Sequence, residues 1–265
     1  MKSSPLTPEE AAAVRFYEGD LTGLPAADPF YADSRAFVSL NALLFPGLGS
    51  EITRIREGKR LNPAVLADLP RLTALYSALL SAAKKGAQPR QRESWRVERA
   101  EDFAQLAAAG QTLSFTSTSL GGFLPAYGDK QGIVLMHFTV PAMTPCIVMA
   151  ELLDNYAKAD EQELLLPPFL TFSASERALT DAERQITDQN GRPPAAVYEI
   201  ALTGQYTAGK PAARPCRVSA QAVSVWAQLN AGTDPAELPQ AAAESLRRFK
   251  ERLTAWVHSI AIFGE

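Results

Sequence analysis

Residues 161–168 read Glu161-Gln162-Glu163-Leu164-Leu165-Leu166-Pro167-Pro168, an acidic pair followed by an apolar run and two prolines. The leucines predict a short buried strand, and prolines are expected at its end because they cannot donate to a strand ladder. Residues two apart on a strand face the same side, so Glu161 and Glu163 are expected side by side. Adjacent carboxylates beside a buried strand are costly unless a cation or a reaction uses them, although acidic clusters also occur on solvated surfaces.

Two stretches upstream indicate further strands with polar side chains. Residues 115–119, Phe-Thr-Ser-Thr-Ser, put hydroxyls on alternate positions beside an aromatic residue. Residues 95–97, Trp-Arg-Val, put a guanidinium beside an aromatic residue in an extended run. The order of arginine, Ser-Thr-Ser and Glu-x-Glu, with Leu-Leu-Leu-Pro-Pro after the second glutamate, resembles the R-S-E class of mono-ADP-ribosyltransferases. The resemblance covers residues 10–205, and its specificity lies in the order and spacing of the three motifs.

Composition and charge are those of an ordinary globular protein. The chain has 265 residues, of which 46% are apolar and 21% charged, enough for one large domain or two small ones. A net charge of −3 provides no basic excess to neutralise phosphates, so nucleic acid is not expected as a partner. No apolar run approaches the ~20 residues that a membrane span needs, so no membrane is expected either.

The few cysteines and histidines restrict the chemistry further. Cys146 and Cys216 are too few for a disulfide framework, and neither has metal-ligand spacing with His137 or His258. A Ser-His-Asp or Cys-His hydrolase therefore has little support, and both histidines are expected to be structural. The sequence also lacks a glycine-rich phosphate loop of the Rossmann or Walker type. We expect no metal, and any dinucleotide must bind in another way.

Residues 9–90 predict a helical lobe. An acidic first turn and an alanine-rich run favour a helix over residues 9–17, and apolar residues recur at helical spacing over residues 37–44. A second apolar stripe runs over residues 66–79, where Pro70 is expected to divide it into two helices.

Short strands are predicted from Ser94 onward. They are expected at residues 94–97, 112–119, 132–140, 145–152, 163–166 and 197–202, with a short helix at 100–109 and a loop at 153–162. Strands that follow a helical segment in this way predict an α+β fold. From Asp234 the tail predicts an amphipathic helix, packed on the domain or presented to a partner. Its apolar face is expected to hold Leu246, Phe249, Leu253, Trp256 and Ile260, with Arg247, Arg248, Lys250 and Arg252 elsewhere.

The resemblance also implies an architecture and a substrate. It implies a single ADP-ribosyltransferase-like domain over residues 1–265, a split β-sandwich with an N-terminal helical lobe and a C-terminal amphipathic helix. The helical lobe would take residues 9–90, the β core residues 91–205 and the helical extension residues 206–265. NAD would be the substrate and would bind in a cleft that has the helical lobe as one wall.

Roles for the motif residues follow from the same resemblance. Glu163 would be the essential carboxylate, which bonds the ribose hydroxyl and stabilises the oxocarbenium ion formed as nicotinamide leaves. Ser117 would orient Glu163, and Thr118 would support the strand near the cofactor. Arg96 would hold the NAD phosphates with paired, charge-assisted hydrogen bonds. Glu161 would orient or deprotonate the acceptor.

Three loop aromatics and one valine complete the expected site. Phe123 or Tyr127, after the Ser-Thr-Ser motif, would stack on nicotinamide unless they serve only in packing. Tyr156 would recognise the acceptor protein, because the family reads its target with that loop. Many relatives have glycine after the motif arginine, where this chain has Val97, so a main-chain contact from this position to nicotinamide would have altered geometry.

The acceptor has two interpretations. A glutamate two positions before the catalytic one is associated with arginine acceptors in this class. The compact size, the helical lobe and the C-terminal helix are also similar to bacterial effectors that ADP-ribosylate ubiquitin on threonine, and no short motif separates the two. An NAD glycohydrolase and a binding module without activity are the alternatives to a transferase.

The first eight residues bear on where the protein acts. Residues 1–8 are rich in Ser, Pro and Thr and lack the apolar core of a cleaved secretory signal. Such a leader suits a type III secreted bacterial effector, a toxin-like protein acting in the host cytosol, and it also suits a cytoplasmic protein.

Overall fold

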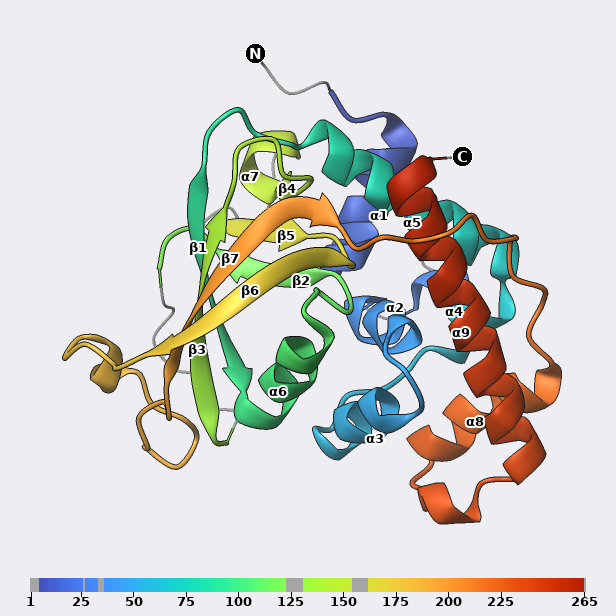
Figure 1. The fold of residues 1–265 in the computed structure, drawn as a ribbon. Coiled ribbons are helices and arrows are strands. Elements are labelled where there is room, and N and C mark those ends of the chain that lie inside the picture. The colour runs from blue at the N-terminus through green and yellow to red at the C-terminus, as the bar shows by residue number, and fades with distance from the viewer. Residues whose placement is uncertain (1–4, 26, 33–35, 123–130, 154–161, 265) are drawn as a thin grey trace. The chain divides into compact units, whose positions relative to one another are not determined.

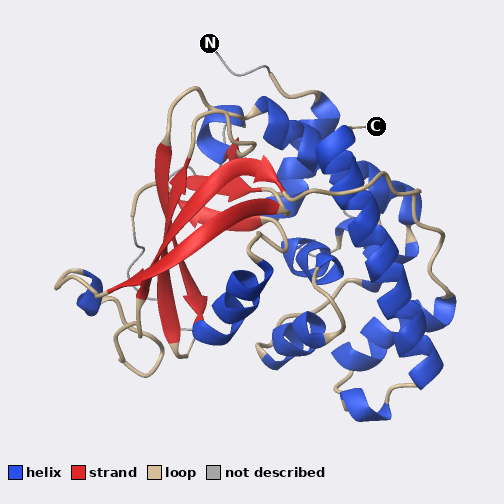
Figure 2. Ribbon diagram, in the orientation of Figure 1, coloured by secondary structure: helices blue, strands red, loops and turns tan. Residues whose placement is uncertain are grey.

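The computed structural model describes residues 5–25, 27–32, 36–122, 131–153 and 162–264. Its contacts divide the chain into two compact units. The sheet unit is built on Ala82–Thr207, and the helical unit combines Thr7–Ser81 with Ala208–Glu265. Helices make up the helical unit, while the strands belong to the sheet unit (Figure 2). The two units show the predicted α+β composition, and the predicted single domain over residues 1–265 stays a prediction.

The helical unit forms where the sequence places apolar stripes and capping residues. Its elements are α1 (Pro8–Glu18), η1 (Pro29–Tyr31), α2 (Ala36–Leu44), α3 (Gly49–Arg56), α4 (Pro63–Ala67), α5 (Leu69–Lys85, which continues into the sheet unit), α8 (Ala220–Asn230), η4 (Pro235–Glu237) and α9 (Gln240–Phe263) (Figure 1). Helix α1 begins with a capping box, in which the Glu10 amide donates to the Thr7 hydroxyl at 3.3 Å and the Thr7 amide donates to the Glu10 carboxylate at 2.7 Å. The predicted division near Pro70 is confirmed, because α4 ends at Ala67 and α5 begins at Leu69.

Helix α9 confirms the predicted apolar face of the tail and corrects one residue. Leu246, Phe249, Leu253, Trp256 and Ile260 are all buried, and α9 packs on α8 and α2. Lys250 was expected among the basic residues away from that face, but it is 1% exposed. A charged partner on α3 accounts for this burial, and the sequence pattern of α9 alone contains no sign of that partner.

The sheet unit contains short strands joined in one sheet. Its elements are β1 (Arg92–Arg99), α6 (Ala100–Ala109), β2 (Thr116–Ser119), β3 (Ile133–Val140), β4 (Ile147–Val148), α7 (Met149–Leu152), β5 (Glu163–Leu166), β6 (Leu170–Arg177), η3 (Glu183–Gln185) and β7 (Val197–Tyr206). The strand order is β4-β5-β2-β1-β3-β7-β6, with β3 and β7 parallel and the other neighbours antiparallel. Strands β1 and β2 pair only at Trp95 and Ser119, so the sheet is nearly divided there, as expected of a split sandwich.

Two strand predictions need correction, and one strand was missed. Residues 112–119 were expected to be a strand, but only the second half is one, as β2 (Thr116–Ser119). Residues 145–152 were expected to be a strand, but only Ile147 and Val148 pair with β5, and Met149–Leu152 is a helical turn. Met, Ala, Glu and Leu are good helix formers, and the paired segment is too short to extend the ladder through them. The edge strand β6 was not predicted, although Leu170, Phe172 and Ala174 alternate with polar residues; this alternation is short, and residues 173–176 are exposed.

Apolar clusters cover both faces of the sheet. The larger one packs α6 onto one face and includes Phe103, Leu106, Val134, Met136, Phe138, Leu164, Leu166 and Ile200. The smaller one lies on the other face and contains Val97, Ile133, Leu135, Ile186 and Val197. Among the helices of the described residues, none is long and apolar enough to cross a lipid bilayer.

Candidate functional site

Glu163 is the first residue of β5, and its side chain is buried, with 6% exposed. The strand ends at Leu166, where Pro167 follows, as the sequence predicts. Before it, Gln162 has a left-handed backbone with φ of 45°, and its carbonyl accepts a hydrogen bond from the Leu120 amide at 2.9 Å. This conformation is uncommon for a residue other than glycine and it ends the extended chain. Glu161 lies outside the described residues, so its expected place beside Glu163 stays a prediction.

The register of three strands decides which side chains accompany Glu163. Strand β2 pairs with β5 so that Ser119 lies opposite Glu163 and Ser117 lies opposite Leu165. Strand β1 then places Trp95 opposite Ser119. Directly paired residues share a face of the sheet, so Trp95, Ser119 and Glu163 form a row across β1, β2 and β5. We call these three residues the site row.

Ser119 was missed by the sequence reasoning, which chose Ser117 from the same motif. Ser117 lies on the same face as Ser119, one strand repeat away from Glu163. Ser119 is the more buried of the two, with 9% exposed, and its hydroxyl accepts a hydrogen bond from the Gly121 amide at 3.3 Å. The alternation of hydroxyls includes both serines, but only the strand register identifies the one opposite Glu163.

Thr118 faces the other side of the sheet and ties β2 to β5. Its buried hydroxyl donates to the main-chain carbonyl of Leu164 at 2.8 Å. Because Leu164 directly follows Glu163, this bond holds the strand on which Glu163 stands. Thr118 therefore joins β2 to β5 from the face of the sheet opposite the site row.

Arg96 leaves β1 toward the face opposite Glu163, because it follows Trp95 and pairs with Met136 of the larger apolar cluster. Its guanidinium donates to the Glu98 carboxylate from Nε at 2.8 Å and from Nη2 at 2.5 Å. Nη1 donates to the main-chain carbonyl of Ser117 at 2.8 Å. The structure therefore brings Arg96 to the main chain of the Ser-Thr-Ser motif, at the near-division of the sheet, but not to the face of Glu163.

Val97 lies on the face of the site row, where its side chain is 2% exposed within the smaller apolar cluster. This burial gives the valine a packing role that glycine could not fill. Four other expected residues, Glu161, Phe123, Tyr127 and Tyr156, lie outside the described residues. Within the described ranges, no group of three or more His, Cys, Asp or Glu side chains is arranged to hold a metal ion.

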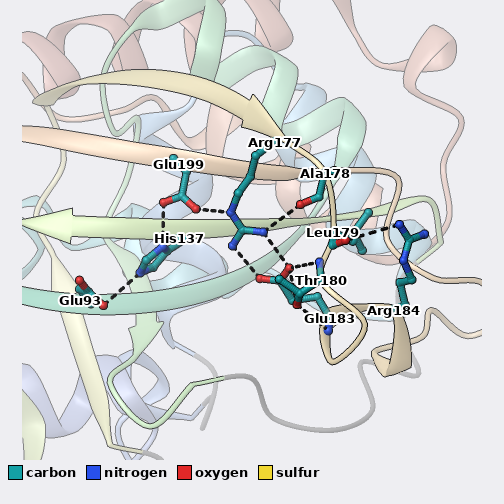
Figure 3. A network of polar contacts seen from close by, with 9 residues as sticks. All are labelled: Glu93, His137, Arg177, Ala178, Leu179, Thr180, Glu183, Arg184 and Glu199. Carbon is teal, nitrogen blue, oxygen red and sulfur yellow. Dashed lines mark hydrogen bonds and ion pairs between the residues drawn. The ribbon is translucent and has the colours of Figure 1, made fainter.

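Trp95 is stacked on His137 of the neighbouring strand β3. Their ring centroids are 3.7 Å apart and their planes differ by 5°. Figure 3 shows His137 between two carboxylates, with Nδ1 at 2.7 Å from Glu199 and Nε2 at 3.5 Å from Glu93. The sequence suggested only a structural role for His137, and its pairing with Trp95 required the register of β1 and β3.

Arg177 extends this network away from the site row. Its Nε donates to Glu199 at 2.5 Å, and its two terminal nitrogens donate to Glu183 at 2.8 and 2.7 Å (Figure 3). Glu183 also accepts from the amide and the hydroxyl of Thr180. Hydrogen bonds from the Arg177 guanidinium lower the pKa of Glu183 to about 2. Glu183 is therefore ionised over the physiological range, and Glu199 is held between Arg177 and His137.

The site row combines a buried carboxylate, a hydroxyl and an indole on one face. A carboxylate removed from water interacts strongly with a positive charge that develops nearby. A hydroxyl in the next strand can bond either the carboxylate or a sugar hydroxyl. This arrangement suits a reaction whose transition state is a sugar cation.

Comparison with known proteins gives a similarity of fold. No protein-family model matches the sequence, and no curated protein matches it. Among solved structures, the enzymatic component C2-I of the C2 toxin from Clostridium botulinum is 13% identical with a TM-score of 0.46, over 76% of this chain and 44% of that chain. The chain thus spans less than half the length of C2-I.

Two other proteins are also similar. The C3 exoenzyme from Clostridium limosum is 13% identical, with a TM-score of 0.43 over 75% of this chain and 86% of that one. Exoenzyme S from Pseudomonas aeruginosa, solved with human 14-3-3 protein beta and carba-NAD, is 17% identical, with a TM-score of 0.39 over 75% of both chains.

Proposed function

We propose that this protein is a mono-ADP-ribosyltransferase that transfers ADP-ribose from NAD to a side chain of a target protein. The observation that carries the proposal is the buried carboxylate of Glu163, at the start of β5 and directly opposite Ser119. The order of the arginine, Ser-Thr-Ser and glutamate motifs along the chain supports it, because those motifs lie on the adjacent strands β1, β2 and β5.

The reaction breaks one bond and forms another at the same carbon. Nicotinamide leaves with the electron pair of its bond to ribose, and the ribose becomes an oxocarbenium ion. Glu163 stabilises that cation and accepts a hydrogen bond from the ribose hydroxyl, an interaction that strengthens as positive charge develops. The acceptor side chain then donates an electron pair to the ribose carbon and loses a proton.

The serines of the motif position Glu163 in this proposal. Ser119 has the closer place, since it lies opposite Glu163, while Ser117 lies opposite Leu165. We therefore assign the orienting role first to Ser119 and extend it to Ser117 as the neighbour on the same face. Activity of Ser119→Ala and Ser117→Ala under the same conditions separates the two assignments.

Arg96 is proposed to hold the NAD phosphates through an exchange of partners. Its guanidinium now donates two hydrogen bonds to Glu98, a carboxylate whose geometry resembles that of a phosphate edge. A phosphate could take the place of Glu98, while the bond to the Ser117 carbonyl keeps Arg96 at the near-division of the sheet. Glu98 thus competes with the dinucleotide for the same guanidinium.

The acceptor is proposed from the sequence pattern. Glu161, two positions before Glu163, would bind or deprotonate the acceptor, and Tyr156 would recognise the target protein. Arginine and the threonine of ubiquitin are the two acceptors that the resemblance supports. We further propose that the protein is a bacterial effector acting on a host protein in the host cytosol.

The test is incubation of the purified protein with biotin-labelled NAD and a eukaryotic lysate, beside Glu163→Ala. A labelled band that is lost in the variant is expected, and its mass identifies the target. Labelling that persists in Glu163→Ala, with the fold retained, refutes the role of Glu163. Free ADP-ribose without labelled protein would instead identify an NAD glycohydrolase, and absence of NAD binding would leave a binding module.

Mass spectrometry of the labelled target decides between the two acceptors. A product on threonine that is stable to neutral hydroxylamine excludes arginine. A band at the size of ubiquitin, modified on threonine, would support the narrower proposal, whereas a modified arginine would refute it.

A further inference from the structure

We propose that Trp95 contacts the nicotinamide ring of NAD and that His137 positions its indole for that contact. This inference rests on the proposed function, since it concerns the same site row. Trp95 shares a face with Glu163 and lies two strands away from it, with Ser119 between them. At about 4.8 Å between neighbouring strands, the Cα atoms of Trp95 and Glu163 are about 10 Å apart.

That separation fits one end of the dinucleotide. Glu163 is assigned to the ribose whose bond breaks, and nicotinamide is the ring attached to that ribose. A ribose at Glu163 with its nicotinamide directed along the row would bridge the gap to the indole. Trp95 is half-buried, so solvent reaches part of its side chain.

The indole is held in one orientation by its neighbours. The imidazole of His137 lies parallel to it at 3.7 Å, and Glu199 bonds that imidazole at 2.7 Å. Arg177 holds Glu199 from its other oxygen (Figure 3). A ring whose orientation is fixed before binding loses little entropy when a ligand contacts it. The network therefore has a use at the site beyond packing, because it sets the plane of Trp95.

The charge of the nicotinamide ring predicts which ligands bind more weakly when Trp95 is replaced. The nicotinamide ring of NAD carries a positive charge, and an indole attracts cations with about 0.5–2 kcal/mol, more than other aromatic rings do. The charge is already present in bound NAD and disappears when the bond to ribose breaks. Loss of the indole is therefore expected to weaken ground-state binding and raise KM without lowering kcat.

The experiment measures binding of three probes, NAD, NADH and ADP-ribose, by calorimetry to the wild-type protein and to Trp95→Leu. NADH carries an uncharged ring and ADP-ribose carries none. We expect Trp95→Leu to weaken NAD binding about tenfold, which corresponds to about 1.4 kcal/mol, to weaken NADH binding less, and to leave ADP-ribose unchanged. Trp95→Phe should recover most of the NAD affinity, and His137→Ala should show a smaller loss of the same pattern.

Tyr198→Leu is the matched control. Tyr198 is a half-buried aromatic residue of the same sheet that stacks on Phe103, at 3.9 Å between ring centroids, on the face opposite the site row. We expect this variant to bind all three probes as the wild-type protein does. Circular dichroism of each variant verifies that the fold is retained.

Fluorescence provides a second measurement if Trp95→Leu fails to fold. NAD should quench the emission of the wild-type protein more than ADP-ribose does, and the conservative variant Trp95→Phe should abolish that difference. An equal loss of NAD and ADP-ribose affinity in Trp95→Leu, or no loss of either, would overturn the inference while the proposed function stands. If the wild-type protein binds none of the probes, the proposed function itself fails.

Discussion

Removing the amine of Lys250 should destabilise the helical unit more than any surface change. Its Nζ lies 2.6 Å from the Glu51 carboxylate, and the two side chains are 1% and 0% exposed. The same Nζ donates to the Gly47 carbonyl at 2.5 Å. Burial lowers the pKa of Lys250 and raises the pKa of Glu51, while each partner opposes the shift of the other. The pair therefore links α9 to α3, and removing either partner leaves the charge of the other buried.

The size of the loss follows from that burial. Lys250→Met leaves the Glu51 carboxylate without a cation, and breaking a buried pair from one side costs about 3–5 kcal/mol. Replacing both residues with apolar ones leaves no unpaired buried charge. The free energy of unfolding of the double variant Glu51→Leu, Lys250→Met should therefore differ from that of the wild-type protein by at most about 1 kcal/mol. For a protein of this size, each kcal/mol lowers the Tm by about 2–4 °C.

The pH dependence has a definite sign. A carboxyl whose folded pKa is raised favours the folded state at low pH, and this contribution is lost as pH rises through the raised value. Without Lys250 the pKa of Glu51 rises further, because burial is then less opposed. The loss of stability in Lys250→Met should therefore be smaller at pH 5 than at pH 8.

The assay is urea denaturation of the two single variants and the double variant, followed by circular dichroism at both pH values. The difference between the sum of the single losses and the double loss measures the coupling of the two residues. The predicted coupling would be contradicted if Lys250→Met lowered the free energy of unfolding by less than about 1 kcal/mol, or if the loss in the double variant equalled the sum of the losses in the two single variants.

Three other predictions concern the sheet unit. Arg177 holds the pKa of Glu183 at about 2. Ionised Glu183 should stabilise the folded protein at pH values above its ordinary pKa of about 4.3, and this contribution should be lost as the pH falls toward 2. Glu183→Gln should therefore make the fall of Tm below pH 5 less steep, and an unchanged dependence of Tm on pH would contradict this. Calorimetry should find that Glu98→Gln tightens NAD binding severalfold and that Arg96→Ala weakens it at least tenfold, whereas unchanged affinity in both would exclude the exchange of partners. Thr118→Val leaves the Leu164 carbonyl without its donor and should cost about 1 kcal/mol in urea denaturation, and a loss near zero would argue against this anchor.

Elements with a strong local pattern could be predicted from the sequence. The helix Ala100–Ala109 and the strand Glu163–Leu166 have the predicted bounds, because Gly110 and the proline pair mark their ends. The edge strand Leu170–Arg177 was not predicted, although Leu170, Phe172 and Ala174 alternate with polar residues as in a half-buried strand. This alternation is short and residues 173–176 are exposed, so the pairing with β7 is what defines the strand.

The candidate site shows the same limit. The motif pattern selected Glu163 and Ser117, but register is a property of two strands that no single stretch contains. It decides that Ser119, rather than Ser117, lies opposite Glu163, and that Arg96 faces away from it. Trp95 and His137 likewise meet only through the pairing of β1 with β3.

Lys250 illustrates the limit in a helix. The pattern placed Lys250 with the basic residues that lie away from the apolar face of the tail. Its burial depends on Glu51, which is far away in the sequence and becomes its partner only when α3 and α9 pack together. Such a pair can be recognised only once the tertiary contacts are known.

We propose that Glu163 stabilises the cation formed when NAD is cleaved. The most direct measurement is the rate of nicotinamide release from NAD by the purified protein, with its labelled target present, for the wild-type protein and Glu163→Gln. Glu176→Gln is the matched control, because it makes the same change at an exposed carboxylate of the same sheet. We expect kcat to fall about 10²- to 10³-fold in Glu163→Gln and to stay at the wild-type value in Glu176→Gln. A folded Glu163→Gln variant that releases nicotinamide at the wild-type rate would contradict it.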